Sequence, residues 1–251
     1  MNTQPSSPLP AHESIPRRLC LAADVEKYSL LDTLGQETVQ SDLVRVLEEA
    51  AALSGLDRTA WERQPQGDQE FAVLPVDTPE PVVLGDFVRH LTERLAVRNA
   101  NRAVPERMRL RLAMDTGVAR TAALGYAGPA PVALARYLNA DQLKRVLAGV
   151  DSTDLALIVS DRLYQDVVRL RGQGLDPRAY VKAHIRQKEF TGYGWIHVPE
   201  HGPEELAELV ADPEPEERTG TGPSQVVERI TGGFNHFGSG DLAQTINKYN
   251  R

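Results

Sequence analysis

Hydrophobic and polar residues follow two periods along residues 17–199, one typical of β-strands and one typical of α-helices. Short apolar runs, or runs in which apolar and polar residues alternate, predict strands over residues 17–23, 107–118, 155–159, 180–188 and 192–198. Apolar residues at helical spacing predict helices over residues 30–56, 87–99, 131–147 and 161–171. Residues 61–76 predict a hairpin whose turn carries Gly67 and Asp68. This order of elements predicts an α+β fold, with helices packed on a mostly antiparallel sheet.

Two local features complete this prediction. Asp161 begins the last predicted helix, where its carboxylate is expected to cap the free backbone N–H groups. Residues 125–128, Gly-Tyr-Ala-Gly, predict a loop before the helix over residues 131–147. This loop lacks the Lys-Ser/Thr pair of a phosphate-binding P-loop.

The composition changes on both sides of the predicted domain. Residues 1–16 are rich in Pro and Ser, lack the apolar core of a signal peptide, and predict a disordered segment. Residues 200–222 predict an acidic flexible linker, because positions 200–218 contain eight acidic residues and only one arginine. A short helix over residues 204–210 is the alternative there. Residues 223–251 regain apolar groups but are too few to bury a core, so we expect them to dock on another surface.

Charge and cysteine content narrow the class of protein. The formal net charge of the 251 residues is −7, which argues against nucleic acid as a partner because a basic surface would carry that affinity. No apolar run approaches the ~20 residues of a membrane-spanning helix, so no membrane partner is expected. The lone Cys20 cannot form an internal disulfide, which suits a reducing compartment. We therefore expect a soluble protein of the cytoplasm.

Two aspartates lie at the ends of predicted strands. Asp24 follows the first apolar run, and Asp68 lies in the predicted hairpin turn. Mg²⁺ binds a nucleoside triphosphate through one or two carboxylates and phosphate oxygens, and strand ends can bring such carboxylates together. The alternative for each aspartate alone is a purely local role, capping a helix or shaping a turn.

The surroundings of these aspartates resemble the class III adenylyl and guanylyl cyclases. Residues 24–29, Asp-Val-Glu-Lys-Tyr-Ser, are similar to the family's Asp-Ile-x-Gly-Phe-Thr, with Lys27 in place of Gly. Gly67-Asp68 is similar to its second metal-binding turn, and the two aspartates are 44 positions apart, as in that fold. Residues 109–118 are similar to its Gly-Ile-His-x-Gly-x-Val strand. The resemblance implies a ferredoxin-like class III cyclase fold over residues 17–199, with two Mg²⁺ or Mn²⁺ ions held by Asp24 and Asp68.

The resemblance also implies residues that contact the nucleotide. Arg136 matches the arginine that steadies charge on the triphosphate, and Lys188 matches a phosphate-binding lysine of the last hairpin. Val132 stands where the family has an asparagine that holds the ribose, and its side chain cannot form a hydrogen bond. Tyr28 and Ser29 take the places of the family's Phe and Thr. Without the resemblance, the favoured interpretation of Arg136 and Lys188 is that they are solvated surface cations.

The base-reading positions of the family are occupied by neutral residues. Gln64 stands three positions before Gly67, where adenylyl members have Lys and guanylyl members Glu. A glutamine amide both donates and accepts hydrogen bonds, so it dictates no purine and leaves a pyrimidine open. The second base-reading position falls near Gly125, which has no side chain.

Two functions are consistent with these residues. The first is a homodimeric nucleotidyl cyclase that converts a nucleoside triphosphate into a 3′,5′-cyclic nucleotide and pyrophosphate; the resemblance alone further implies a role in bacterial signalling, including anti-phage signalling. In it, Asp24 and Asp68 of one protomer meet Arg136 and Lys188 of the other. The second is a nucleotide-binding sensor without turnover, whose segment 223–251 signals to an effector protein. Val132, Gln64 and Lys27 favour the sensor, whereas the two aspartates, Arg136 and Lys188 favour the enzyme.

Overall fold

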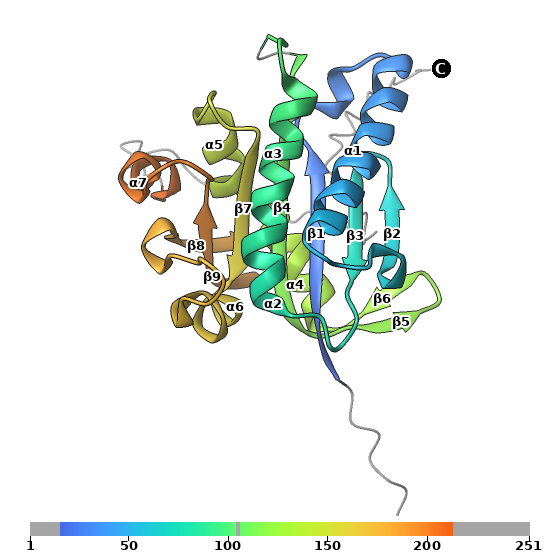
Figure 1. Ribbon diagram of the computed structural model, residues 1–251. Helices are drawn as coiled ribbons and strands as arrows, with labels where there is room; N and C mark the ends of the chain where they lie inside the picture. Colours follow the sequence, from blue (N-terminus) through green and yellow to red (C-terminus); the bar gives the residue numbers. More distant parts are fainter. Residues whose placement is uncertain (1–15, 104–105, 213–251) are drawn as a thin grey trace, which may run out of the picture.

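The computed structural model describes residues 16–103 and 106–212, which form a seven-stranded sheet covered by helices on both faces (Figure 1). The strands of this sheet follow the order β2-β3-β1-β4-β7-β9-β8. Their bounds are β1 Arg17–Val25, β2 Glu62–Gln66, β3 Gln69–Val73, β4 Leu110–Val118, β7 Leu155–Ser160, β8 Val181–Gln187 and β9 Phe190–His197. A separate two-stranded hairpin consists of β5 (Arg120–Ala122) and β6 (Gly125–Ala127).

Neighbouring strands of the main sheet run antiparallel, except β4 and β7, which are parallel with Leu110 opposite Leu155. A parallel pair needs a crossover connection, and the chain between these two strands supplies helices for it. The mostly antiparallel α+β prediction is therefore confirmed.

Two helical layers sandwich the sheet. In Figure 1, α1 and α3 lie side by side over its front face, and α4 lies behind it. The bounds are α1 Thr33–Leu53, α3 Val88–Asn99, α4 Pro129–Leu138, α5 Asp141–Gly149, α6 Asp161–Asp166 and α7 Pro203–Val210. Shorter helical turns are α2 Glu80–Val82 and the segments Tyr28–Leu30, Arg58–Ala60, Val83–Phe87, Val168–Leu170 and Pro177–Ala179.

Strand β1 is buried on both faces. Leu19 and Leu21 belong to the core under α1 and α3, whereas Cys20 and Ala22 belong to the core under α4 and α5. Successive side chains of a strand point to opposite faces, so a central strand between two helical layers needs apolar residues at nearly every position. This explains the unbroken apolar run at the start of the domain, and the small Ala22 leaves room beneath α4.

Three local predictions are corrected. The helix expected over residues 131–147 is two helices, because α4 ends at Asn139, whose side-chain amide donates to the carbonyl of Ala135 at 3.1 Å, and Ala140 is extended. The cap of α6 is Ser160, which accepts from the N–H of Leu163, and not Asp161. The loop expected over residues 125–128 contains strand β6, because its backbone pairs with β5.

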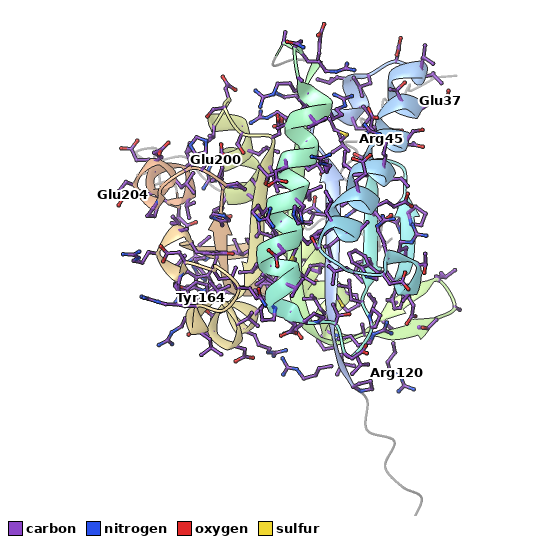
Figure 2. The ribbon with its side chains drawn as sticks, viewed as in Figure 1. Glu37, Arg45, Arg120, Tyr164, Glu200 and Glu204 are labelled. Carbon is purple, nitrogen blue, oxygen red and sulfur yellow. The ribbon has the colours of Figure 1, made fainter. Side chains whose placement is uncertain are left out.

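Helix α7 lies inside the range expected to be a linker. Its apolar residues Leu206 and Val210 are buried, and it packs against α5 and β8. Arg145 of α5 donates to the carbonyl oxygens of Leu209 and Ala211, which lie at the end of α7. The acidic residues face solvent, as Glu204 does at the edge of the domain (Figure 2). The flexible-linker prediction is therefore wrong for residues 203–210, where the alternative, a short helix over residues 204–210, is confirmed. Residues 1–15, 213–222 and 223–251 lie outside the described residues.

A search of the described helices for a membrane span found none with the necessary length and apolar character.

Candidate functional site

Asp24 and Asp68 lie next to each other at one end of the sheet. Asp24 is the penultimate residue of β1, and Asp68 lies in the turn between β2 and β3. The N–H of Val25 donates to the backbone carbonyl of Asp68 at 3.1 Å, and Asp24 stands opposite Gln69 in the β1–β3 ladder. The turn is tight, with Gly67 at a φ of 61°, a conformation that favours glycine. Strand pairing thus brings together two carboxylates that are distant in sequence.

Burial disfavours the charged form of both carboxylates. Asp24 is 3% exposed, and burial raises its pKa to about 6, although the neighbouring Arg111 guanidinium acts in the opposite direction. Burial also raises the pKa of Asp68, which is less enclosed. The charge of Asp68 contributes further to the raised pKa of Asp24. The two groups form an electrostatically coupled pair that a cation would stabilise.

Arg111 of β4 is the direct partner of Asp24. The two residues are opposite each other in the β1–β4 ladder, so their side chains lie on the same face, and the Arg111 guanidinium donates to the Asp24 carboxylate. Arg111 was not among the residues that sequence reasoning selected. Its signal was a charged residue inside a predicted strand of mostly apolar residues, but only the strand register joins it to Asp24.

A cavity of about 600 Å³ opens beside the pair. It is lined by acidic and basic groups together with the polar residues that follow β1, among them Tyr28, Ser29, Asp68, Arg111 and Lys144. Lys144 comes from α5 in the crossover between β4 and β7, and no sequence pattern signalled it. The cavity lining therefore holds two carboxylates, Glu26 and Asp68, and three cations, Lys27, Arg111 and Lys144, while Asp24 is buried next to it. This mixture of charges suits a polyphosphate with a divalent cation.

The chemistry of the two carboxylates fits Mg²⁺ or Mn²⁺, with the remaining ligands supplied by phosphate oxygens and water. Both carboxylates have pKa values raised by burial, and a nearby divalent charge would favour their ionised forms. Within residues 16–103 and 106–212, no three His, Cys, Asp or Glu side chains are grouped to hold a metal. A second ion would therefore depend on the same two carboxylates and on the ligand.

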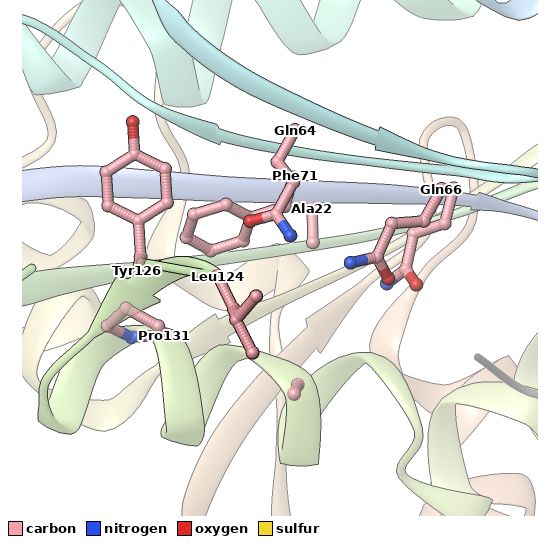
Figure 3. Close-up of a pocket in the computed structure, with 9 residues that line it drawn as sticks. Ala22, Gln64, Gln66, Phe71, Leu124, Tyr126 and Pro131 are labelled. Carbon is pink, nitrogen blue, oxygen red and sulfur yellow. The ribbon is translucent and has the colours of Figure 1, made fainter. Parts of the chain in front are cut away.

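A second pocket, lined by no charged side chain, lies between the sheet, the β5–β6 hairpin and α4 (Figure 3). Gln64, Phe71 and Ala22 stand opposite one another across β2, β3 and β1. Gln66, Gln69 and Asp24 form the row two positions further along these strands. Rows two positions apart share a face of the sheet, so the pocket and Asp24 are neighbours. The remaining wall comes from the β5–β6 hairpin and α4, through Leu124, Tyr126, Pro131 and Ala135.

Gln64 packs directly on Gly125. A Cβ added to Gly125 would lie 2.3 Å from the Gln64 side-chain oxygen, and Gly125 has a φ of 118°. The backbone conformation favours a glycine here, and any larger residue would also push the flexible end of the Gln64 side chain aside. Tyr126 donates to Glu62 at 2.8 Å, which fixes the hairpin against β2. The structure thus brings together the two positions that the resemblance assigned to the base.

Val132 and Arg136 lie one turn apart on α4, and neither lines the cavity beside Asp24 and Asp68. Val132 is 49% exposed, and Arg136 donates to Glu189 at 2.7 Å rather than to Asp24 or Asp68. Lys188 occupies the turn between β8 and β9 with a φ of 54°. The structure therefore brings Arg136 close to the turn that carries Lys188, as a second cluster.

Comparison with known proteins identifies solved structures of the same fold but no relative by sequence. No protein-family model and no curated protein matches the sequence. Among solved structures, an adenylate/guanylate cyclase/hydrolase from Silicibacter pomeroyi is 17% identical, with a TM-score of 0.50 over 74% of this chain and 99% of its own. The guanylate cyclase domain from Catenaria anguillulae in complex with GTP is 13% identical, with a TM-score of 0.49 over 73% of this chain and 96% of its own. The chain has the fold of class III nucleotidyl cyclase catalytic domains, as the sequence resemblance predicted.

Proposed function

We propose that the protein is a nucleotidyl cyclase that converts a nucleoside triphosphate into a 3′,5′-cyclic nucleotide and pyrophosphate. One observation carries this proposal. Asp24 and Asp68 meet at the end of the sheet, beside a cavity that also holds Arg111 and Lys144. This arrangement supports binding of a metal–triphosphate complex, and the cyclase fold supports the reaction class.

The side chains of the protein bind and orient the nucleotide and neutralise its charge. Asp24 and Asp68 would hold two Mg²⁺ or Mn²⁺ ions, which when bound activate the ribose 3′ hydroxyl and neutralise phosphate charge. Arg111 and Lys144 line the same cavity and would bind phosphate oxygens. The ribose 3′ hydroxyl would lose its proton to solvent as its oxygen attacks the α-phosphorus in line; the bond from that phosphorus to the bridging oxygen breaks, and pyrophosphate leaves. The protein contributes positioning and charge stabilisation and forms no covalent bond with the substrate.

The uncharged pocket is the proposed base site. Its lining holds no charged side chain, and Gln64 supplies an amide that both donates and accepts. Tyr126 and Phe71, whose ring centroids lie 5.3 Å apart, offer aromatic surface for a planar ring. Tyr28 and Ser29 lie in the neighbouring cavity and would contact the ribose or phosphates.

We further propose that two protomers complete each site. Arg136 pairs with Glu189 in its own protomer, and the α4 surface that carries Val132 is half-exposed. Leu124, at the tip of the β5–β6 hairpin, is 95% exposed. Exposed apolar residues beside a polar site support a contact with a second copy. Each site would then combine Asp24 and Asp68 of one protomer with Arg136 and Lys188 of the other.

The test is direct. Purified protein is incubated with each of the four nucleoside triphosphates and Mn²⁺, and the products are identified by mass spectrometry. A cyclic monophosphate, absent when Mn²⁺ is chelated, supports the proposal and identifies the base. Absence of a cyclic product from all four nucleotides would overturn it.

A nucleotide-binding sensor is the second candidate, favoured by Val132. An exposed valine cannot hold a ribose hydroxyl by a hydrogen bond, so the site would bind nucleotide without orienting the attacking oxygen. In this case Mn²⁺-dependent nucleotide binding is retained without product formation, and the signal passes to an effector protein. In the first case the cyclic product itself would serve bacterial signalling, including anti-phage signalling.

A further inference from the structure

Arg136 has more hydrogen-bonding capacity than its surroundings use. It lies in the last turn of α4, and its side chain is 19% exposed. One terminal nitrogen donates to Glu189 at 2.7 Å. Its Nε is buried and has no acceptor among the described residues. A buried guanidinium N–H without an acceptor is costly, so the group is prepared to bind a further oxygen.

Glu189 is held beside Arg136 by the turn that carries it. Gln187, just before the turn, donates through its side chain to the carbonyl of Asn139 at 3.0 Å. Phe190, just after the turn, packs edge-on against Tyr137 with ring centroids 5.3 Å apart. Both contacts are to α4 or its cap, so the two-residue turn between β8 and β9 is fixed on that helix. The Glu189 carboxylate therefore stays within reach of Arg136 although its side chain is 76% exposed.

A carboxylate and a phosphate are alternative acceptors for the same guanidinium N–H groups. We propose that Glu189 is an internal competitor for the triphosphate: its carboxylate occupies Arg136 in the nucleotide-free protein and must be displaced before Arg136 binds a phosphate oxygen. This inference rests on the proposed function, in which Arg136 contacts the triphosphate.

The expected effect is moderate, because exposed ion pairs are weak. Removing the Glu189 charge should tighten binding of a polyphosphate by about two- to five-fold. The carboxylate then no longer competes for Arg136, and it no longer repels the anionic polyphosphate. In turnover, the same change should lower KM and leave kcat unchanged, because the competitor acts on binding and not on the transition state.

The experiment is calorimetric titration with inorganic tripolyphosphate and Mg²⁺ at low salt. The proteins are the full-length chain, Glu189→Gln, Arg136→Gln and the double variant. Glu204→Gln is the matched control, since this exposed glutamate of α7 lies in a different element (Figure 2). We expect tighter binding only for Glu189→Gln, and no effect of that change in the Arg136→Gln background.

Equal affinity of Glu189→Gln and the unmodified chain would overturn the inference, as would the same tightening with Arg136 absent. Failure of the cyclase assignment would give a different pattern of results from failure of this inference. If no cyclic nucleotide forms but Glu189→Gln still tightens tripolyphosphate binding through Arg136, the competitor stands and the catalytic assignment falls. If cyclic product forms and Glu189→Gln changes neither KM nor affinity, the cyclase assignment stands and the competitor falls.

Discussion

Arg111 stands directly across the β1–β4 ladder from Asp24, and its guanidinium donates to the Asp24 carboxylate from within the protein interior. This pair places a fixed positive charge beside the carboxylate that is proposed to bind metal. The positive charge offsets the cost of burying the Asp24 carboxylate, and the guanidinium is also placed to bind a phosphate oxygen there.

Removing Arg111 should therefore destabilise the fold. Arg111→Met leaves the buried Asp24 carboxylate without its partner, and breaking a buried pair in this way costs about 3–5 kcal/mol. The free energy of unfolding, measured by urea titration at pH 7, should fall by that order. Arg111→Lys is the control, since it retains the charge and should lose less. Equal stability of Arg111→Met and the unmodified chain would contradict the pairing.

The two carboxylates should be separately essential for metal-dependent binding. Asp24→Asn and Asp68→Asn each leave one carboxylate, which should hold the two proposed ions and their triphosphate far more weakly than the pair does. Mn²⁺-dependent nucleotide binding and turnover should be lost in both, measured by calorimetry and product analysis. Asp77→Asn changes an exposed aspartate outside the site and should have no effect. Retention of Mn²⁺-dependent activity in both site variants would show that the metal site lies elsewhere.

Stability without metal should depend on the titration of Asp24. Its pKa of about 6 lies above the ordinary value of 3.8, so the folded protein holds this proton more tightly than the unfolded chain. The protonated group therefore favours folding: its contribution is complete below pH ~3.8 and is lost as the pH rises through about 6. The loss amounts to about 3 kcal/mol at about 1.4 kcal/mol per pH unit. Urea unfolding in chelator at pH 4 to 7 measures it, and Asp24→Asn should lack this slope; an unchanged slope would refute the shifted pKa.

A shared site predicts complementation between inactive proteins. Asp24→Asn and Arg136→Ala should each be inactive as homodimers. After mixing and exchange of protomers, half of the dimers carry one change on each chain, and one of their two sites is intact. About one quarter of the unmodified activity should return, measured as cyclic product per protomer. A protein that is monomeric by light scattering and fully active would exclude the shared site.

Val132 distinguishes the two proposed functions. Val132→Asn restores a side chain that can hold the ribose, and correcting a misplacement of about 1 Å is worth on the order of a hundredfold in rate. In a cyclase limited by this position, kcat should rise while nucleotide affinity stays nearly constant. Val132 is half-exposed, so the change should be tolerated by the fold. A sensor should show no gain, and a slower enzyme would indicate that another group holds the ribose.

The sequence alone determined the features that depend on local periodicity. The apolar run of residues 19–23 predicted a buried strand, because a strand covered on both faces has no polar side to display. Gly67 and Asp68 marked a turn, because a tight turn needs the backbone freedom of glycine. The order of these elements was sufficient for the α+β class and the resemblance, and it led to Asp24 and Asp68.

The tertiary structure decided everything that depends on register and on packing between distant elements. Arg111 meets Asp24 only because β1 and β4 pair in one particular register, and a shift of one residue would turn it to the other face. Lys144 reaches the cavity through a crossover helix, and Glu189 meets Arg136 through a turn fixed on α4. Helix α7 forms in an acidic segment because α5 covers its two buried apolar residues, Leu206 and Val210. Such contacts join residues far apart in sequence, so no local period carries a signal for them.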